Sequence, residues 1–119
     1  MGFLEILKQA VDNVKGGIAA TIMAKDGIAL QNYVKESGAY DMDSLGVEYG
    51  RILEEAKNAS SLLKLGEVEE LSVSAEGTTI IMRLINKDYF IAMVLGAGGN
   101  AGKARYYLKR AAAGVRKEL

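Results

Sequence analysis

The sequence contains no cysteine, no histidine and no proline among its 119 residues. Without thiolates or imidazoles, the chain cannot form a Cys/His zinc site, a disulfide, or a Ser-His or Cys-His nucleophile pair. Hydrolytic triads and thiol redox chemistry are therefore excluded. We expect a protein that is not an enzyme and that uses neither a metal ion nor another cofactor.

The chain also has no net charge and few aromatic residues. Fifteen Lys and Arg residues balance fifteen Asp and Glu residues, and aromatic residues make up only 7% of the chain. Nucleic-acid-binding proteins use a basic field, and those that bind single strands add aromatic stacking platforms. We therefore expect no nucleic-acid partner. A small protein without net charge tends instead to associate with other proteins.

Long hydrophobic runs are missing as well. The densest run, residues 89–95, is about a third of the length that spans a bilayer. Residues 1–6 lack the basic stretch and the uninterrupted apolar run of a secretory signal. We expect a cytoplasmic protein with no direct membrane insertion. Hydrophobic residues still make up 50% of the chain, which is enough for one core, so we predict a single domain over residues 1–119.

Hydrophobic periodicity predicts eight elements of secondary structure. Apolar residues recur three and four apart in helical segments and alternate with polar residues, or run continuously, in strands. Asp26-Gly27 between two strand-like runs is a hairpin signal, and Asp43 or Ser44 is the expected cap of the second helix. The predicted order is helix, strand, strand, helix, three strands and helix, at residues 3–14, 18–24, 28–34, 43–66, 70–75, 79–85, 89–95 and 101–119.

The contrast between the strands predicts their order in the sheet. Residues 18–24 and 89–95 are apolar on both faces, which is typical of central strands covered on both sides. Residues 70–75 alternate with serine, which favours an edge. Tight turns join consecutive strands except across the second helix. We therefore predict an α+β fold, a three-layer α/β/α sandwich with a five-stranded, mostly antiparallel sheet.

The second predicted helix carries a stripe of small side chains at Ala56, Ala59 and Ser60. Small residues allow another backbone to come close. Packing on the sheet explains the stripe, and packing on a partner helix is the alternative. Polar side chains point roughly the other way, at Glu48, Arg51, Glu54, Glu55 and Asn58.

A glycine-rich loop at residues 96–104 suggests phosphate binding. It is not a Walker A loop, because Ala104 stands where a Ser or Thr must hold magnesium. Gly96, Gly98 and Ala101 match a dinucleotide fingerprint, but residues 101–119 are expected to form a helix and no second parallel strand, which that fold unit requires. We predict a connection in which Asn100 caps the last helix. Nucleotide binding through residues 96–103 is the alternative.

Two segments resemble the roadblock / dynein light chain family. Residues 17–30, an apolar strand leading into a polar turn that ends in Asp-Gly, are similar to the family's first hairpin. Residues 100–111, with their Asn, Gly and basic-aromatic-Leu pattern, are similar to its last helix. The element order matches over essentially the whole chain. The resemblance implies a single roadblock-like, profilin-like domain over residues 1–119.

The resemblance also implies a homodimer, in which the second helices pack together and the third strands join two sheets into one. The edge strand and the small-residue stripe agree with this arrangement. A heterodimer with a related chain or a tetramer stays open. We expect Val73→Pro to disrupt the pairing by deleting an edge-strand amide. The implied interface residues are Ile52, Ala56, Ala59, Leu71, Ser72, Val73 and Ser74.

Prokaryotic members of this family imply a second partner, a Ras-like small GTPase. The resemblance implies a module that scaffolds or regulates this GTPase, including by activating GTP hydrolysis through the GTPase's own residues. The residues expected to face the GTPase are Glu48, Arg51 and Glu55. The alternative is a structural dimerisation subunit of a larger motor or signalling assembly, with no effect on GTP hydrolysis.

Overall fold

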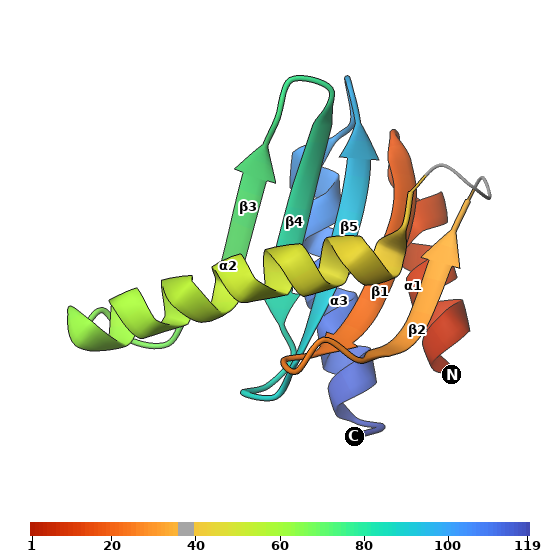
Figure 1. The fold of residues 1–119 in the computed structure, drawn as a ribbon. Helices are drawn as coiled ribbons and strands as arrows, with labels where there is room; N and C mark the ends of the chain where they lie inside the picture. The colour runs from red at the N-terminus through yellow and green to blue at the C-terminus, as the bar shows by residue number, and fades with distance from the viewer. Residues whose placement is uncertain (36–39) are drawn as a thin grey trace.

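The computed structural model describes residues 1–35 and 40–119 (Figure 1). Its elements are α1 (Phe3–Asp12), β1 (Gly17–Ala24), β2 (Ala29–Val34), α2 (Met42–Leu62), β3 (Glu70–Ser74), β4 (Thr78–Leu84), β5 (Tyr89–Gly96) and α3 (Ala101–Arg116). Its five strands form one sheet in the order β2-β1-β5-β4-β3, and each pair of neighbours is antiparallel. Helices α1 and α3 cover one face of this sheet, and α2 crosses the other. The predicted three-layer α+β fold is confirmed.

The sheet separates two apolar cores. Ile91 and Met93 of β5 belong to the core under α1 and α3, whereas Phe90, Ala92 and Val94 of the same strand belong to the core under α2. Side chains alternate between the two faces of a strand, so a strand covered on both sides is apolar throughout. This confirms the central position predicted for residues 89–95, and β3 lies at an edge as predicted.

The first hairpin forms as its sequence predicts. Gly27 adopts a φ of 93°, a left-handed conformation that glycine enters without a Cβ clash. The Asp26 carboxylate accepts a hydrogen bond from the Ile28 amide at 3.3 Å and closes the turn. β1 and β2 then pair in antiparallel register from this turn.

The cap of α2 differs from the prediction. Asp41, rather than Asp43 or Ser44, is the N-cap: its carboxylate accepts bonds from the Ser44 hydroxyl at 2.7 Å and the Ser44 amide at 3.1 Å. These two bonds, the hydroxyl bond first, lower the pKa of Asp41. Asp41, Asp43 and Ser44 each carry an oxygen that can accept a bond from a helix N–H. Asp41 stands three residues before the Ser44 amide, which is the spacing of an N-cap.

The glycine-rich loop has a structural role. The Gly96 amide donates to the Gly16 carbonyl and the Asn100 amide donates to the Lys15 carbonyl, both at 2.9 Å. A Cβ on Gly99 would lie 3.3 Å from the Lys15 carbonyl oxygen, so this loop packs backbone against backbone on the α1–β1 connection. Asn100 then caps α3 as predicted, accepting from the Lys103 amide at 3.0 Å.

Candidate interaction surface on the second helix and the edge strand

Helix α2 crosses the sheet and continues beyond its edge. Figure 1 shows its C-terminal part extending past β3. The buried residues of this helix are Met42, Gly46, Gly50 and Leu53. From residue 54 to residue 62 no side chain of the helix is buried, and this stretch rises about 13 Å along the axis. We call residues 54–65 the overhang.

The small residues that meet the sheet are glycines, not the alanines of the predicted stripe. A Cβ on Gly46 would collide with the terminal methyl of Met23, and one on Gly50 would lie 3.2 Å from the Phe90 ring. The prediction that the stripe packs on the sheet is wrong at Ala59, which is exposed. Its other members, Ala56 and Ser60, are only half-buried. The helix has already passed the strands that could cover them.

Large apolar side chains gather on the overhang and beside it. Ile52 is 46% exposed, and three leucines that follow are more exposed still. Several large apolar side chains exposed within one short segment are typical of an interaction site. Sequence reasoning assigned Ile52 to an interface but did not assign the leucines, although an apolar run at the end of a polar helix was a readable signal. The three leucines are Leu62, Leu63 and Leu65.

Two of these residues and two alanines form one stripe along the helix and its C-cap. Ile52, Ala56, Ala59 and Leu63 follow spacings of four, three and four, which place them on one face of an α-helix. Large side chains stand at both ends of the stripe and alanines in its middle. Such a stripe is complementary to itself when two copies lie antiparallel.

The edge strand β3 has two different faces. Leu71 and Val73 are half-buried and pack on the core beneath α2. Ser72 and Ser74 are exposed, and the Ser72 hydroxyl accepts a hydrogen bond from the Arg105 guanidinium at 3.3 Å. The predicted alternation of this strand is confirmed.

At the free edge of β3, three residues direct their backbone N–H and C=O groups away from the sheet. The Leu84 amide donates to the Glu69 carbonyl, and hydrogen-bonded pairs alternate along an antiparallel ladder. Leu71 and Val73 therefore direct their backbone groups to β4. The residues that direct theirs outward are Glu70, Ser72 and Ser74.

This alternation corrects the expectation for Val73→Pro. The Val73 amide bonds within its own sheet, so a proline there removes a hydrogen bond to β4 and leaves the outer edge unchanged. Ser72 is the position at which a proline deletes an outward donor. The sequence pattern identified an edge strand but could not identify which amides are free.

The residues predicted to face a GTPase lie on the solvent side of α2. Glu48 and Arg51 form an ion pair at 3.3 Å, and their side chains are 63% and 65% exposed. Glu55 is exposed one turn further along the helix. The exposure agrees with the predicted placement, and the role of these residues stays a prediction.

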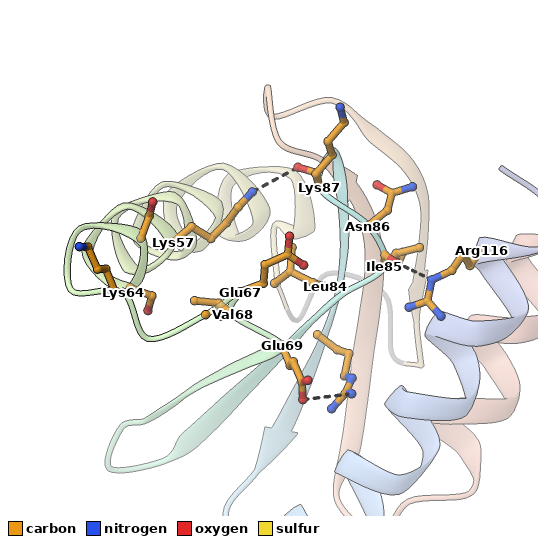
Figure 2. A pocket seen from close by; sticks show the side chains of 14 residues that line it. Lys57, Lys64, Glu67, Val68, Glu69, Leu84, Ile85, Asn86, Lys87 and Arg116 are labelled. Atoms are coloured by element: carbon orange, nitrogen blue, oxygen red, sulfur yellow. Dashed lines mark hydrogen bonds and ion pairs between the residues drawn. The ribbon is translucent and has the colours of Figure 1, made fainter.

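A groove of about 690 Å³ lies beneath the overhang (Figure 2). Residues from α2, the β3 approach, the β4–β5 turn and the end of α3 line it. Its lining includes five cationic side chains and two acidic ones. The charged residues are Lys57, Lys64, Arg83, Lys87 and Arg116, with Glu67 and Glu69.

Two contacts hold the walls of this groove together. The Lys57 ammonium donates to the Glu54 carboxylate at 2.8 Å and to the Lys87 carbonyl at 3.2 Å, which ties α2 to the β4–β5 turn. The Arg116 guanidinium donates through Nε to the Ile85 carbonyl at 2.6 Å.

The described part of the chain contains no helix both long enough and apolar enough to cross a membrane.

Comparison with known proteins identifies the family. No protein-family profile and no curated protein matches the chain. The crystal structure of MglC from Myxococcus xanthus is 40% identical, with 100% of both chains covered and a TM-score of 0.71. A Roadblock/LC7 domain from Streptomyces avermitilis is 15% identical, with 98% of this chain and 96% of that one covered and a TM-score of 0.88.

The gliding protein MglB from Thermus thermophilus is also 15% identical, with 97% of this chain and 86% of that one covered and a TM-score of 0.86. At such identities these two similarities establish the fold alone. The similarity to MglC extends over the full length at a much higher identity. The chain therefore belongs to the Roadblock/LC7 family, as the resemblance of its first hairpin and last helix predicts.

Proposed function

We propose that this chain is a homodimeric binding module that regulates a Ras-like small GTPase. The proposal rests on one observation: an exposed apolar surface and an exposed strand edge lie on the same side of the molecule. The apolar overhang of α2 projects past β3, and the backbone edge of β3 lies unpaired beneath it (Figure 1). Exposed edges and apolar patches are liabilities in a monomer, and a second copy covers both.

The α2 stripe fits an antiparallel partner helix. In that arrangement Ile52 of one copy faces Leu63 of the other, and Ala56 faces Ala59. The alanines let the helix axes approach closely, and the large side chains fill the ends. An MglB structure that is 16% identical, with a TM-score of 0.88, has a tetrameric arrangement, which supports self-association within this fold.

The GTPase-binding surface is proposed on the outer side of the paired α2 helices. Glu48, Arg51 and Glu55 supply charged, solvent-accessible side chains there. The module has no catalytic groups of its own in this proposal, so it acts by favouring one arrangement of the GTPase's own residues. Family membership supports this partner class.

The proposal is tested by mixing the purified protein with the Ras-like GTPase encoded nearest to its gene. We expect a dimer by light scattering, binding that depends on the bound nucleotide, and a changed rate of GTP turnover. Arg51→Ala should weaken the complex, whereas Lys109→Ala on exposed α3 should not. Absence of binding in both nucleotide states would rule out the regulator.

A structural subunit is the second candidate, and the apolar overhang favours it. Three exposed leucines at one end of a helix can anchor a non-GTPase partner without affecting nucleotide hydrolysis. This candidate predicts that Leu62→Ser removes a partner while GTP turnover of the GTPase stays unchanged.

A further inference from the structure

Positive charge is concentrated on the last helix. Residues 101–117 contain six of the fifteen Lys and Arg residues and no Asp or Glu residue. The rest of the chain therefore holds nine cationic and fifteen acidic residues, so a protein without net charge has one basic side. Charge segregated in this way favours association with an acidic partner. The six cations, all at exposed positions of α3 and its C-cap, are Lys103, Arg105, Lys109, Arg110, Arg116 and Lys117.

Three of these cations form a single row along the helix. Lys103, Arg110 and Lys117 are spaced seven residues apart, which places them within about 40° of one another around the axis and about 10.5 Å apart along it. None of the three forms an ion pair with any residue among 1–35 and 40–119. Arg105, on the other side of the exposed surface, pairs with Glu70 at 3.0 Å. The row is therefore the part of the basic surface that keeps its charge available.

The row borders a groove of about 510 Å³ between α1 and α3, which we call the α1–α3 groove. Arg110 and Lys117 are the cationic residues that line it, and Glu118 is the acidic one. Both cations are exposed, whereas several apolar lining residues are buried. A concave surface with apolar residues at its base and charges beside them is typical of a site for an amphipathic helix. The buried apolar lining residues are Ile6, Ala10 and Ala111.

A glycine of α3 keeps this groove open. Gly114 lines the groove, and a Cβ at this position would lie 3.5 Å from the terminal methyl of Ile6. Alanine would fit at ordinary contact distance, but a longer side chain would press on α1 or project into the groove. Glycine within a helix is destabilising relative to alanine, and no positive φ requires it here. Its small size leaves room for another helix above Ala10 and Ala111.

Arg110 is oriented without losing its charge. Its guanidinium carbon lies 5.6 Å from the centre of the Tyr106 ring and 6.0 Å from the centre of the Tyr107 ring. The two rings meet edge to face, with their centres 5.3 Å apart. Aromatic rings hold a guanidinium in place but leave it cationic, whereas a carboxylate would neutralise it. Arg110 therefore presents an oriented cation beside the groove.

The acidic residues of α1 do not face this cation. Neither Glu5 nor Asp12 lines the groove, and the Asp12 carboxylate accepts a hydrogen bond from the Tyr33 hydroxyl at 3.0 Å. Helix α1 instead contributes the uncharged polar residues Gln9 and Asn13. The groove thus has cations on its α3 side and neutral polar groups on its α1 side, which favours a ligand with acidic residues along one edge.

We propose that the α1–α3 groove binds an amphipathic helix of a partner protein whose acidic residues are spaced seven positions apart. The apolar side of this helix packs over Ala10 and Ala111, and its carboxylates pair with the row formed by Lys103, Arg110 and Lys117. Two helices that lie side by side share the same rise per residue, so this spacing matches the row. A lipid surface fits less well, because it is flat and does not reach buried residues at the base of a groove.

The position of the groove makes this site independent of the function proposed above. Helices α1 and α3 cover one core of the sheet, and α2 covers the other. A helix in the α1–α3 groove and a GTPase on the outer side of α2 therefore bind on opposite faces of the sheet. Loss of one interaction leaves the other measurable.

Two designed peptides test the proposal. Each is a fluorescein-labelled helix of about 18 residues with a Leu/Ala stripe, and three positions seven apart beside the stripe carry Glu in one peptide and Lys in the other. Fluorescence anisotropy should show that wild-type protein binds the Glu peptide at least about tenfold more tightly than the Lys peptide. Arg110→Glu/Lys117→Glu should reverse this preference. Equal affinities for the wild type, or binding of neither peptide, would overturn the proposal.

A matched variant separates the row from general electrostatic attraction. Lys87→Glu/Lys109→Glu makes the same change in net charge at exposed positions that do not line the α1–α3 groove. It should keep the wild-type preference for the Glu peptide. A reversal as large as that of Arg110→Glu/Lys117→Glu would show that net charge alone selects the peptide, which would overturn the groove as the site.

The shape of the groove is tested at Gly114. Gly114→Leu should weaken binding of the Glu peptide about tenfold, because its side chain fills the groove, whereas Gly114→Ala should bind as the wild type does. Circular dichroism verifies that both variants are folded. Sedimentation with vesicles of phosphatidylcholine and phosphatidylserine gives the competing outcome. Vesicle binding that Arg110→Glu/Lys117→Glu abolishes, without any preference between the peptides, would make the row a membrane contact and overturn the proposal.

Discussion

The two halves of α2 share one continuous helical backbone and have nearly opposite surroundings. In the first half, Gly46, Gly50 and Leu53 are buried against the sheet. In the second half, Ala59 and Leu62 are exposed, and Leu62 is 82% accessible. Small residues occur in both halves, but only the glycines bring the helix close to its own sheet. The same sequence feature therefore serves the fold in one half and is available to a partner in the other.

A leucine-to-alanine substitution should have different effects on stability in the two regions, and the largest effect is expected in the buried one. Leu53→Ala should lower the free energy of unfolding by about 2–5 kcal/mol, because it opens a cavity at a side chain that is 1% exposed. Leu63→Ala should act only through the dimer, so its effect grows with protein concentration. Urea unfolding at several concentrations checks both. A concentration-independent loss of several kcal/mol at Leu63 would contradict the comparison.

A charge in the stripe should break association while leaving the fold intact. Ala59→Glu is expected to weaken the dimer by about 3 kcal/mol or more, since a carboxylate would be buried without a partner between two helices. Asn58→Glu, on the neighbouring exposed side, is the matched control. Light scattering gives the mass, and circular dichroism verifies the helix content. Equal masses for the two variants would place the interface elsewhere.

Two adjacent prolines sharpen the same distinction at the edge strand. Val73→Pro should lower the free energy of unfolding by about 1–3 kcal/mol, because it removes a hydrogen bond to β4 and leaves a carbonyl unpaired. Ser72→Pro should weaken dimerisation more than folding, since it deletes only an outward donor. Thermal unfolding and sedimentation measured on both variants test this. The opposite ranking would mean that the Val73 amide, and not the Ser72 amide, points away from β4.

The smallest expected effect concerns the buried half's own cap. Bonds from the Ser44 hydroxyl and amide lower the pKa of Asp41 from 3.8, so the carboxylate contributes stability above that pH. This contribution is lost as the pH falls through the lowered value of the folded state. Asp41→Asn keeps an acceptor but cannot titrate, so its acid unfolding should lack this component. Unfolding followed from pH 6 to pH 2 should show the difference, and identical profiles would exclude the cap as a titrating group.

Much of the fold could be predicted because its determinants are local. Asp26-Gly27 between two strand-like runs favours a hairpin turn. Asn100 caps α3 because its side-chain oxygen can accept a bond from the amide three residues on, at Lys103. The continuous apolar character of β5 indicated a central strand. The resemblance to the roadblock family added the predicted interface residues, which no periodicity distinguished from core residues.

The rest depended on where the helices lie. Asp41, Asp43 and Ser44 are all capable caps, and the tertiary fold selects the first. Leu63 continues the apolar spacing of Ile52, Ala56 and Ala59, yet the helix has left the sheet before it reaches this position. The groove is built from three distant segments, so no local pattern contained it.

Local sequence patterns predict the element order, the central positions of β1 and β5 and the edge position of β3, because turn chemistry and side-chain periodicity act over a few residues. The resemblance of two segments predicts the family. The tertiary fold alone establishes that α2 extends past β3, which amides of β3 point outward, and that Lys64, Lys87 and Arg116 line the same groove. The register of β3 on β4 determines which amides point outward, and the overhang and the groove depend on the direction of α2 across the sheet. That direction is set by two glycines packing against Met23 and Phe90, contacts between residues more than twenty positions apart in the chain.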